Sequence, residues 1–230
     1  MFEELKQKVC DANLQLVRED LVIQTWGNAS AFDRGSGVVV IKPSGISYDT
    51  MRPEHMAVLK IETGQLLEGG LRPSSDTDTH LELYRAFPGI AGVVHTHSLY
   101  ATAWAQAQRE IPPLGTTHAD YFLGPVPCTR PMTYAEIETH YELNTGKVIV
   151  ERFAALDPLQ VPAVLVASHA PFVWGDSVEK AVENALVLEY VARLASESLT
   201  LNPAAPPIER ALLHKHFLRK HGPTAYYGQK

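Results

Sequence analysis

An apolar run that ends in two closely spaced histidines constrains the fold of this chain more than any other feature of its sequence. Residues 90–94 are Ile-Ala-Gly-Val-Val, and His95-Thr96-His97 follows directly. Such a run is typical of a buried strand, and side chains two residues apart in a strand point to the same face. The sequence therefore predicts a sheet with a pair of imidazoles at one edge, where both can bind one metal ion.

A third histidine gives this pair the composition of a zinc site. His169 follows a predicted strand at residues 163–167, and two strand ends that lie side by side would bring three imidazoles together. Zinc favours imidazole nitrogen, and three protein ligands with one open position are typical of catalytic zinc. His80, His118 and His140 are alternative third ligands, and short His-x-His pairs also occur on surfaces that bind no metal.

The rest of the chain mixes predicted helices and strands without strict alternation. Apolar periodicity and capping pairs such as Thr133/Glu136 and Asp176/Glu179 predict helices at residues 2–16, 76–86, 98–107, 133–143, 176–191 and 208–217. Apolar or β-branched runs predict strands at residues 38–41, 57–61, 90–95, 147–151 and 163–167. We therefore expect the α/β class, with residues 1–230 forming a single-domain α/β/α sandwich around a central, largely antiparallel or mixed sheet.

Composition excludes several broad classes of function. The formal net charge is −6, whereas nucleic-acid and membrane-surface binders usually carry a basic excess. No apolar run approaches the length that spans a bilayer, and the charged N-terminal segment is unlike a signal peptide. The two cysteines, Cys10 and Cys128, form no metal-binding pair in the sequence. We expect a cytoplasmic protein that binds neither nucleic acid nor membrane.

Three small-residue turns are candidates for an anion site. Lys42, Ser44 and Gly45 follow a predicted strand, Ser74 and Ser75 precede a predicted helix, and Asn28 lies in a turn at residues 26–30. Hydroxyl groups and backbone amides at such positions bind phosphate readily. Each turn alone is also ordinary turn sequence, and the chain contains neither a GxxxxGK[ST] nor a GxGxxG motif.

Two further segments carry groups that can transfer protons. Asp120 lies in the polar segment 116–121 and is either a positioned acid/base or a solvated loop carboxylate. The basic run at residues 214–221 is a solvated face or a patch for a small anionic substrate. Tyr227 lies in the last residues of the chain, where an isolated tail would fray.

Together these motifs resemble the L-ribulose-5-phosphate 4-epimerases of the class II aldolase and epimerase superfamily. The resemblance runs from the N-terminal helix to the final Tyr-Tyr-Gly-Gln. The motifs that carry it are Thr25-Trp26-Gly27-Asn28, Ile41-Lys42-Pro43-Ser44-Gly45, Pro73-Ser74-Ser75-Asp76-Thr77, Val94-His95-Thr96-His97-Ser98, Gly115-Thr116-Thr117-His118-Ala119-Asp120-Tyr121 and Arg219-Lys220-His221-Gly222. Segments 153–162 and 196–208 match less well.

The resemblance implies a role for each residue of the site. The implied metal ligands are His95, His97 and His169, with Asp76 at or beside the metal. The implied phosphate-binding residues are Asn28, Lys42, Ser44, Gly45, Ser74 and Ser75. Asp120 and Tyr227 would be the acid/base pair, and Thr116, Glu142, His216 and Arg219 are additional candidates.

The resemblance also implies an activity and an assembly. One zinc ion per subunit would serve the interconversion of L-ribulose 5-phosphate and D-xylulose 5-phosphate, in L-arabinose, L-ascorbate or L-xylulose catabolism. The family forms C4 homotetramers, so the tail at about residues 208–230 would complete a neighbouring subunit's site. A ketose-phosphate aldolase of the same superfamily and a non-catalytic, adducin-like assembly domain are the alternatives. Asp76 favours the epimerase, because the aldolases have the longer glutamate there.

Overall fold

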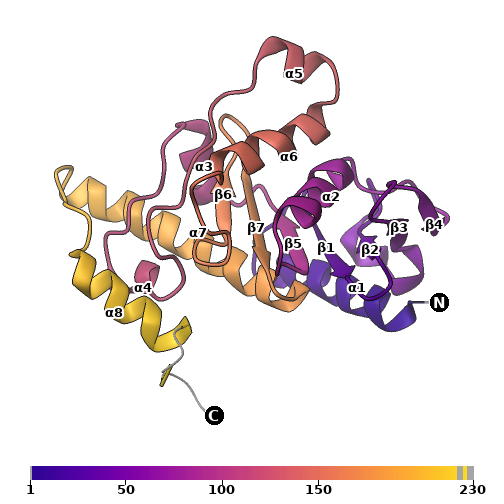
Figure 1. Cartoon of the computed structure of the whole chain (residues 1–230), viewed down its shortest axis with the longest axis horizontal. Helices are drawn as coiled ribbons and strands as arrows, with labels where there is room; N and C mark the ends of the chain where they lie inside the picture. Colours follow the sequence, from indigo (N-terminus) through magenta and orange to yellow (C-terminus); the bar gives the residue numbers. More distant parts are fainter. Residues whose placement is uncertain (1, 222–224, 227–230) are drawn as a thin grey trace.

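One antiparallel sheet organises the molecule, as the computed structural model of residues 2–221, 225 and 226 shows (Figure 1). In this described part of the chain seven strands pair in the order β4-β3-β2-β1-β5-β7-β6, and every neighbouring pair is antiparallel. Helices lie on both faces of the sheet. The predicted α/β/α sandwich with a largely antiparallel sheet is confirmed.

The strands are β1 (Asn28–Asp33), β2 (Val38–Ile41), β3 (Ala57–Lys60), β4 (Leu66–Glu68), β5 (Gly92–His95), β6 (Ala163–Leu165) and β7 (Pro171–Gly175). The α-helices are α1 (Glu3–Arg18), α2 (Thr77–Ala86), α3 (Leu99–Gln106), α4 (Thr116–Ala119), α5 (Tyr134–Glu138), α6 (Tyr141–Arg152), α7 (Val178–Leu201) and α8 (Arg210–His221). Two short 3₁₀ turns, η1 (Tyr48–Thr50) and η2 (Pro53–His55), join β2 to β3. Among these described helices, none has the length and apolar character that crossing a bilayer requires.

Two helical layers enclose the sheet. The long helix α7 packs against β5 and β7 and contacts α1 and α3, while α2 and α6 pack closely against each other on the other side. Gly146 of α6 allows this close approach, because a Cβ atom there would lie 2.7 Å from the Cβ of Glu82 in α2. The buried strands β2, β5 and β7 then supply a continuous apolar core that includes Trp174 and Phe172.

The predicted strand at residues 147–151 is wrong, because this segment belongs to helix α6. Its buried residues, Thr145, Gly146, Val148 and Ile149, recur at helical spacing and face α2. The run Lys-Val-Ile-Val-Glu is too short for periodicity to distinguish a strand from one face of a helix. Packing against α2 outweighs the modest β propensity of valine and isoleucine.

Several predicted boundaries also change. The Thr133/Glu136 capping box is confirmed, but its helix α5 ends at Glu138, where Thr139 leaves helical geometry (φ −100°, ψ −93°). Helix α7 is capped by Ser177, which accepts from the amide of Lys180, and not by Asp176. The sequence did not predict strands β1, β4 and β7, and Asn28, expected in a turn, begins β1.

A fully buried asparagine joins helix α1 to strand β1. The side-chain amide of Asn13 donates to the carbonyls of Val9 (2.7 Å) and Ala29 (3.1 Å), and its oxygen accepts from the amide of Ala29 (2.8 Å). Ala29 lies just beyond the last residue of β1 that pairs with β2. The side chain of Asn13 therefore makes the hydrogen bonds to Ala29 that β2 does not reach. It fixes the beginning of β1, where Asn28 lies.

We predict that Asn13→Leu lowers the free energy of unfolding by about 2–4 kcal/mol, because it leaves two buried backbone groups of Ala29 without partners. Urea denaturation followed by circular dichroism measures the change. Gln7→Leu, on the exposed face of the same helix, is the matched control and should change stability by less than about 0.5 kcal/mol. Equal effects in the two variants would contradict the role given to Asn13.

Candidate active site

The end of strand β5 is the centre of the candidate site. His95, its last residue, pairs in register with Asn28 of β1 on one side and with Phe172 of β7 on the other. The His95 and Phe172 rings stack, with centroids 4.2 Å apart. Because neighbouring strands run in opposite directions, the start of β1, the end of β5 and the turn before β7 meet at one sheet edge.

Three histidines converge at this edge, as the sequence predicted. Their ligand nitrogens all lie within 4.8 Å of one another, and the Nε2 atoms of His95 and His97 are 3.2 Å apart. In a tetrahedral site with ordinary zinc–nitrogen bonds, neighbouring nitrogens lie about 3.3 Å apart. His169 comes from the turn between β6 and β7, which brings it beside the other two rings (centroids 5.0 and 5.2 Å).

The protonation of these rings suits metal binding. The Nδ1 atom of His95 lies 2.9 Å from the carbonyl oxygen of Pro171, so Nδ1 carries the proton and Nε2 faces the cluster with a free lone pair. Burial lowers the pKa of His169 to about 4 and also lowers the pKa of His97. The imidazoles of His97 and His169 are therefore available as neutral ligands near pH 7, and the donor set and spacing of the three histidines fit zinc.

Two residues of the pocket lining contact the ligands His169 and His97. The Tyr141 hydroxyl lies 3.4 Å from Nδ1 of His169, and the half-exposed indole of Trp26 lies against His97 with centroids 6.1 Å apart. Ser168 adopts a left-handed conformation (φ +60°), and its amide donates to the carbonyl of Ala105. This anchored turn presents His169 toward the end of β5.

A pocket of about 380 Å³ opens beside the histidines and collects most of the predicted site residues. Its lining includes Asn28, Lys42, Ser44, Gly45, Ser74, Ser75, Asp76, Glu142 and the three histidines. Thr25, Trp26, Gly27 and Tyr141 complete it. Of these, Tyr141 carried no recognisable signal in the sequence, because it lies in the helix predicted at residues 133–143 and in none of the motifs that suggested a site.

Two of the three turns predicted to bind phosphate lie side by side in this pocket. Residues Pro43 and Pro73 form an antiparallel bridge, the amide of Ser44 donates to the carbonyl of Arg72, and the amide of Ser74 donates to the carbonyl of Lys42. These bonds bring the hydroxyls of Ser44 and Ser74 to the same wall. The sequence placed them in separate turns, and the backbone pairing unites them.

Lys42 brings a buried positive charge to the same wall. The residue is 2% exposed, its Nζ donates to the carbonyls of Thr25 (3.2 Å) and Pro43 (3.4 Å), and it lies 4.8 Å from the centroid of the Tyr48 ring. Burial lowers the pKa of Lys42 to about 8. An anion in the pocket would therefore stabilise the protonated form of this amine.

The turn that precedes Asn28 depends on a glycine. Gly27 has φ +80°, and a Cβ atom there would lie 2.6 Å from Cγ1 of Val22 and 2.9 Å from the carbonyl oxygen of His95. Only a residue without a side chain allows this chain to pass so close to the end of β5. The Trp-Gly-Asn sequence therefore places Trp26 beside His97 and pairs Asn28 with His95.

Asp76, which precedes α2, also lines the pocket, beside Ser74. Its Oδ2 accepts from the side-chain amide of Asn28 at 2.7 Å, and Ser74 Oγ lies 3.5 Å from the same oxygen. Asp76 is not among the residues whose ligand atoms cluster within 4.8 Å, so its place at or beside the metal stays a prediction. Of the alternative third ligands, His80 is buried against Ser30, His118 against Gly124, and His140 is exposed.

Asp120 lies elsewhere in the same chain and does not line this pocket. Its carboxylate accepts from Arg219 (Nη2 2.8 Å, Nε 3.1 Å) and from Nδ1 of His216 (3.0 Å), and its backbone carbonyl accepts from His221 (2.8 Å). Burial opposes the charge of Asp120, but hydrogen bonds from Arg219 and His216 lower its pKa below the ordinary value. Asp120, His216 and Arg219 form one group, which we call the Asp120 cluster.

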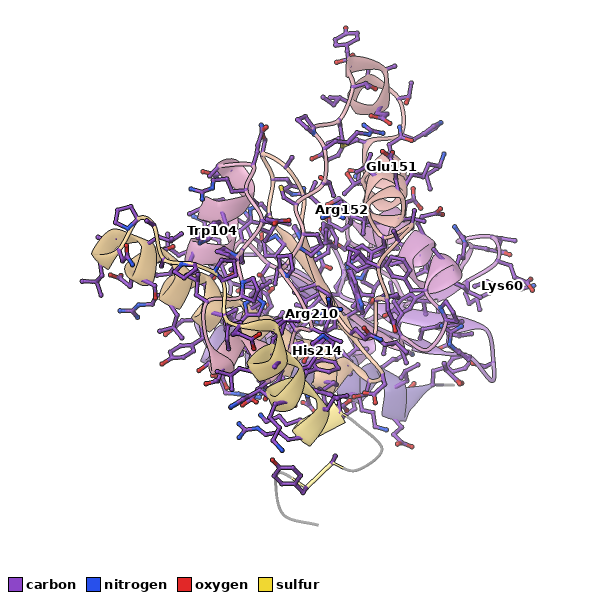
Figure 2. The ribbon with its side chains drawn as sticks, turned by 60° about the vertical axis from the view of Figure 1, so that its left-hand side comes forward. Lys60, Trp104, Glu151, Arg152, Arg210 and His214 are labelled. Atoms are coloured by element: carbon purple, nitrogen blue, oxygen red, sulfur yellow. The ribbon has the colours of Figure 1, made fainter. Side chains whose placement is uncertain are left out.

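Helix α8 and helix α4 present this cluster together (Figure 1). Figure 2 shows Arg210 and His214 on the same helix α8, which lies on the near side of the molecule in that view. Lys220 of α8 also lies over the ring of Tyr121, which donates to Glu183 of α7. Thr116 lies in α4, away from the pocket, and Tyr227 falls outside the described residues.

Comparison with known proteins relates this site to a single family. The family described as Class II Aldolase and Adducin N-terminal domain matches residues 7–196. Over 229 residues, covering 100% of both chains, the protein is 56% identical to L-ribulose-5-phosphate 4-epimerase UlaF of Salmonella paratyphi C (strain RKS4594). It is 55% identical, over the same coverage, to the protein of that name from Salmonella typhi.

Solved structures show the same fold. An L-fuculose 1-phosphate aldolase superposes with a TM-score of 0.77 at 27% identity, over 92% of this chain and 95% of that one. YgbL of Klebsiella pneumoniae, titled a putative aldolase/epimerase/decarboxylase, superposes with a TM-score of 0.72 at 24% identity, over 94% and 99% of the two chains. The second likeness concerns the fold alone.

We predict that His97→Asn loses most of its bound zinc and stays folded, because two imidazoles then remain of a three-histidine set. Metal analysis of the purified variant, beside circular dichroism, measures both effects. His140→Asn is the matched control, since His140 is exposed and outside the cluster, and it should keep its metal. A full equivalent of zinc in His97→Asn would exclude the three-histidine assignment.

Proposed function

The chain belongs to the Class II Aldolase and Adducin N-terminal domain family and, through relatives that match it over the whole of both chains, to the L-ribulose-5-phosphate 4-epimerases; we propose that it is a zinc-dependent enzyme that interconverts L-ribulose 5-phosphate and D-xylulose 5-phosphate. One zinc ion per subunit and a cytoplasmic location are part of the proposal. The observation that carries it is that one pocket holds both the three-histidine cluster and a wall formed by Lys42, Ser44 and Ser74, which we call the phosphate wall.

The pocket supports a reaction that breaks and remakes one carbon–carbon bond. C4 of the ketopentose phosphate bears a hydroxyl and no acidic proton, so direct deprotonation is unfavourable. Removing the proton of the C4 hydroxyl and cleaving C3–C4 gives glycolaldehyde phosphate and the enediolate of dihydroxyacetone. Rotation of the aldehyde and re-addition on its other face inverts C4. Zinc, when held by His95, His97 and His169, supplies a Lewis acid for negative charge on the sugar oxygens.

The residues of the chain have two tasks in this scheme. Lys42, Ser44 and Ser74, with backbone amides of the same turns, hold the phosphate, so the aldehyde fragment stays bound while it rotates. Two groups on opposite faces of the aldehyde must exchange the C4 hydroxyl proton, and we assign them to Asp120 and Tyr227. Glu142 lines the pocket and is available to orient a sugar hydroxyl.

The positions of these groups support a shared site between subunits as part of the proposal. Asp120 accepts hydrogen bonds from His216 and Arg219 of α8 in the same chain. It does not line the pocket of that chain. We therefore assign the whole Asp120 cluster, with Tyr227, to a neighbouring subunit's pocket in a C4 tetramer. This extends the expectation from the sequence, which placed only the tail, from about residue 208 to residue 230, at the neighbouring site.

The experiment that tests the function is a coupled assay for D-xylulose 5-phosphate. With L-ribulose 5-phosphate as substrate, we expect turnover that a chelator abolishes and added zinc restores. Release of dihydroxyacetone without D-xylulose 5-phosphate would identify a ketose-phosphate aldolase instead. No turnover by zinc-loaded protein would favour a non-catalytic, adducin-like assembly domain.

The buried amine of Lys42 predicts a pH dependence of substrate binding. Its pKa of about 8 lies below the ordinary value because of burial, so the amine loses its charge as the pH rises past 8. A neutral amine attracts the phosphate dianion less, and the KM should rise above that pH. In Lys42→Met the KM should be high throughout and lack this rise. An unchanged KM from pH 7 to 9.5 in the wild type would contradict the assignment of Lys42 to the phosphate.

Mixed oligomers test whether the site is shared. His97→Asn damages the pocket and Tyr227→Phe damages the tail, so each should be inactive or nearly so alone. A positioned acid/base contributes about 10²–10⁴-fold, which sets the loss expected in Tyr227→Phe. In a randomly mixed ring, about one quarter of the interfaces join an intact pocket to an intact tail, and activity should recover accordingly.

The matched control mixes Asp120→Asn with Tyr227→Phe. Both changes damage the group that we assign to the neighbour, so every interface keeps one defect and no activity should recover. Native mass spectrometry confirms that hybrids form in both mixtures. Recovery in the control mixture, or none in the first, would show that Asp120 and Tyr227 do not act together on an adjacent subunit.

A further inference from the structure

A chain of buried polar side chains runs beneath the pocket. Tyr84 donates to the carbonyl oxygen of Ser30 (3.0 Å), the Tyr84 and Ser30 hydroxyls are 2.8 Å apart, and Ser30 Oγ is 2.7 Å from Nδ1 of His80. His80 is completely buried and lies edge-on to Phe172, whose ring stacks on His95. Polar side chains, and not only apolar ones, therefore pack beneath the three-histidine cluster.

Two buried atoms in this region have no hydrogen-bond partner among the described protein atoms. They are Nε2 of His80 and Oδ1 of Asn28. Asn28 has already committed its amide nitrogen to Ser74 and Asp76, and its orientation is fixed, because the flipped amide would place an oxygen 2.7 Å from the Asp76 carboxylate. Leaving a buried donor or acceptor unpaired is unfavourable, so both atoms need a partner.

The fold places these two side chains on facing elements that are bonded to each other. Asn28 and Ser30 are two apart in β1 and point to the same face, and His80 is bonded to Ser30. On the facing helix, His80 is one turn beyond Asp76, which is bonded to Asn28. The bonds Asn28–Asp76 and Ser30–His80 thus close a ring between β1 and the beginning of α2.

We propose that a single buried water molecule bridges His80 Nε2 and Asn28 Oδ1 and makes His80 a positioning residue for Asp76. Water suits this place because it can donate to Asn28 Oδ1 while it either accepts from or donates to His80 Nε2, whichever tautomer Ser30 selects. An anion would be repelled by Asn28 Oδ1.

The bridge acts on the reaction through Asn28. It holds the carboxamide so that its nitrogen faces Asp76, and Asp76 in turn is kept against the wall of the pocket. Burial lowers the pKa of His80 to about 3, so the imidazole stays neutral and adds no charge beneath the metal cluster. The consequence for catalysis rests on the proposed epimerase function, whereas the water site itself does not.

The first test is a crystal structure of the zinc-loaded, full-length wild type at a resolution that shows ordered water. We expect one water within hydrogen-bond distance of both His80 Nε2 and Asn28 Oδ1. A direct bond of either atom to a protein group, or no density between them, would overturn the water site. This arm gives its answer whether or not the protein epimerises L-ribulose 5-phosphate.

The second test compares two amides at position 80. His80→Gln places a polar atom near the former Nε2, and His80→Asn places one near the former Nδ1. We expect His80→Asn to keep its fold and zinc but lose about 10–100-fold in kcat/KM, with more dihydroxyacetone released per epimerisation, and His80→Gln to recover most of the loss. Equal losses in both variants would mean that His80 only fills space.

A double-mutant cycle shows whether the effect passes through Asp76. In an Asp76→Asn background, His80→Asn should cost much less than in the wild type, since the group that it positions is already changed. Thermal unfolding of all four proteins separates this coupling from a general loss of stability. Independent, multiplicative effects on kcat/KM would overturn the positioning role even if the water is seen.

Discussion

His95 can reach its partners only because β5 pairs antiparallel with β1 on one side and with β7 on the other. A shift of one residue in either register would turn the imidazole to the opposite face of the sheet. The observed register places His95 between Asn28 and Phe172, and the turn before β7 then delivers His169. The metal cluster, the polar side chains below it and the wall with Asp76 all follow from this pairing.

Buried polar groups near the pocket are matched to specific partners, and this gives the apolar core its single arrangement. Asn13 satisfies both backbone groups of Ala29, Ser30 links His80 to Tyr84, and Asn28 holds Asp76. Each bond is worth only about 1 kcal/mol, but an unpaired buried group costs more than a formed bond gains. The sheet edge is thereby held against slipping, which a site built from three strand ends requires.

The chain separates the groups that we propose to bind the substrate from the groups that we propose to transfer protons. The metal cluster and the phosphate wall share one pocket, whereas Asp120 is bonded to α8 elsewhere on the molecule. Arg219 and His216 keep the Asp120 carboxylate ionised, as the lowered pKa indicates. A ring of subunits that joins one chain's pocket to the next chain's Asp120 cluster reconciles this separation with the proposed chemistry.

The amino-acid sequence by itself determined the chemical groups of the site and the class of the fold. His95 and His97 after an apolar strand, and the serines of two turns, are local patterns whose chemistry depends on spacing alone. The helical state of residues 141–152 was decided by packing against α2, since a short β-branched run fits either a strand or one helix face. Only the tertiary structure shows that the third histidine of the cluster is His169 and not His80, His118 or His140. It also shows that Ser44 and Ser74 lie on one wall, that Tyr141 lines the pocket, and that Asp120 does not. The physical reason is the same throughout: these contacts join residues far apart in the chain, and the pairing of β1, β5 and β7 selects them, not any local propensity.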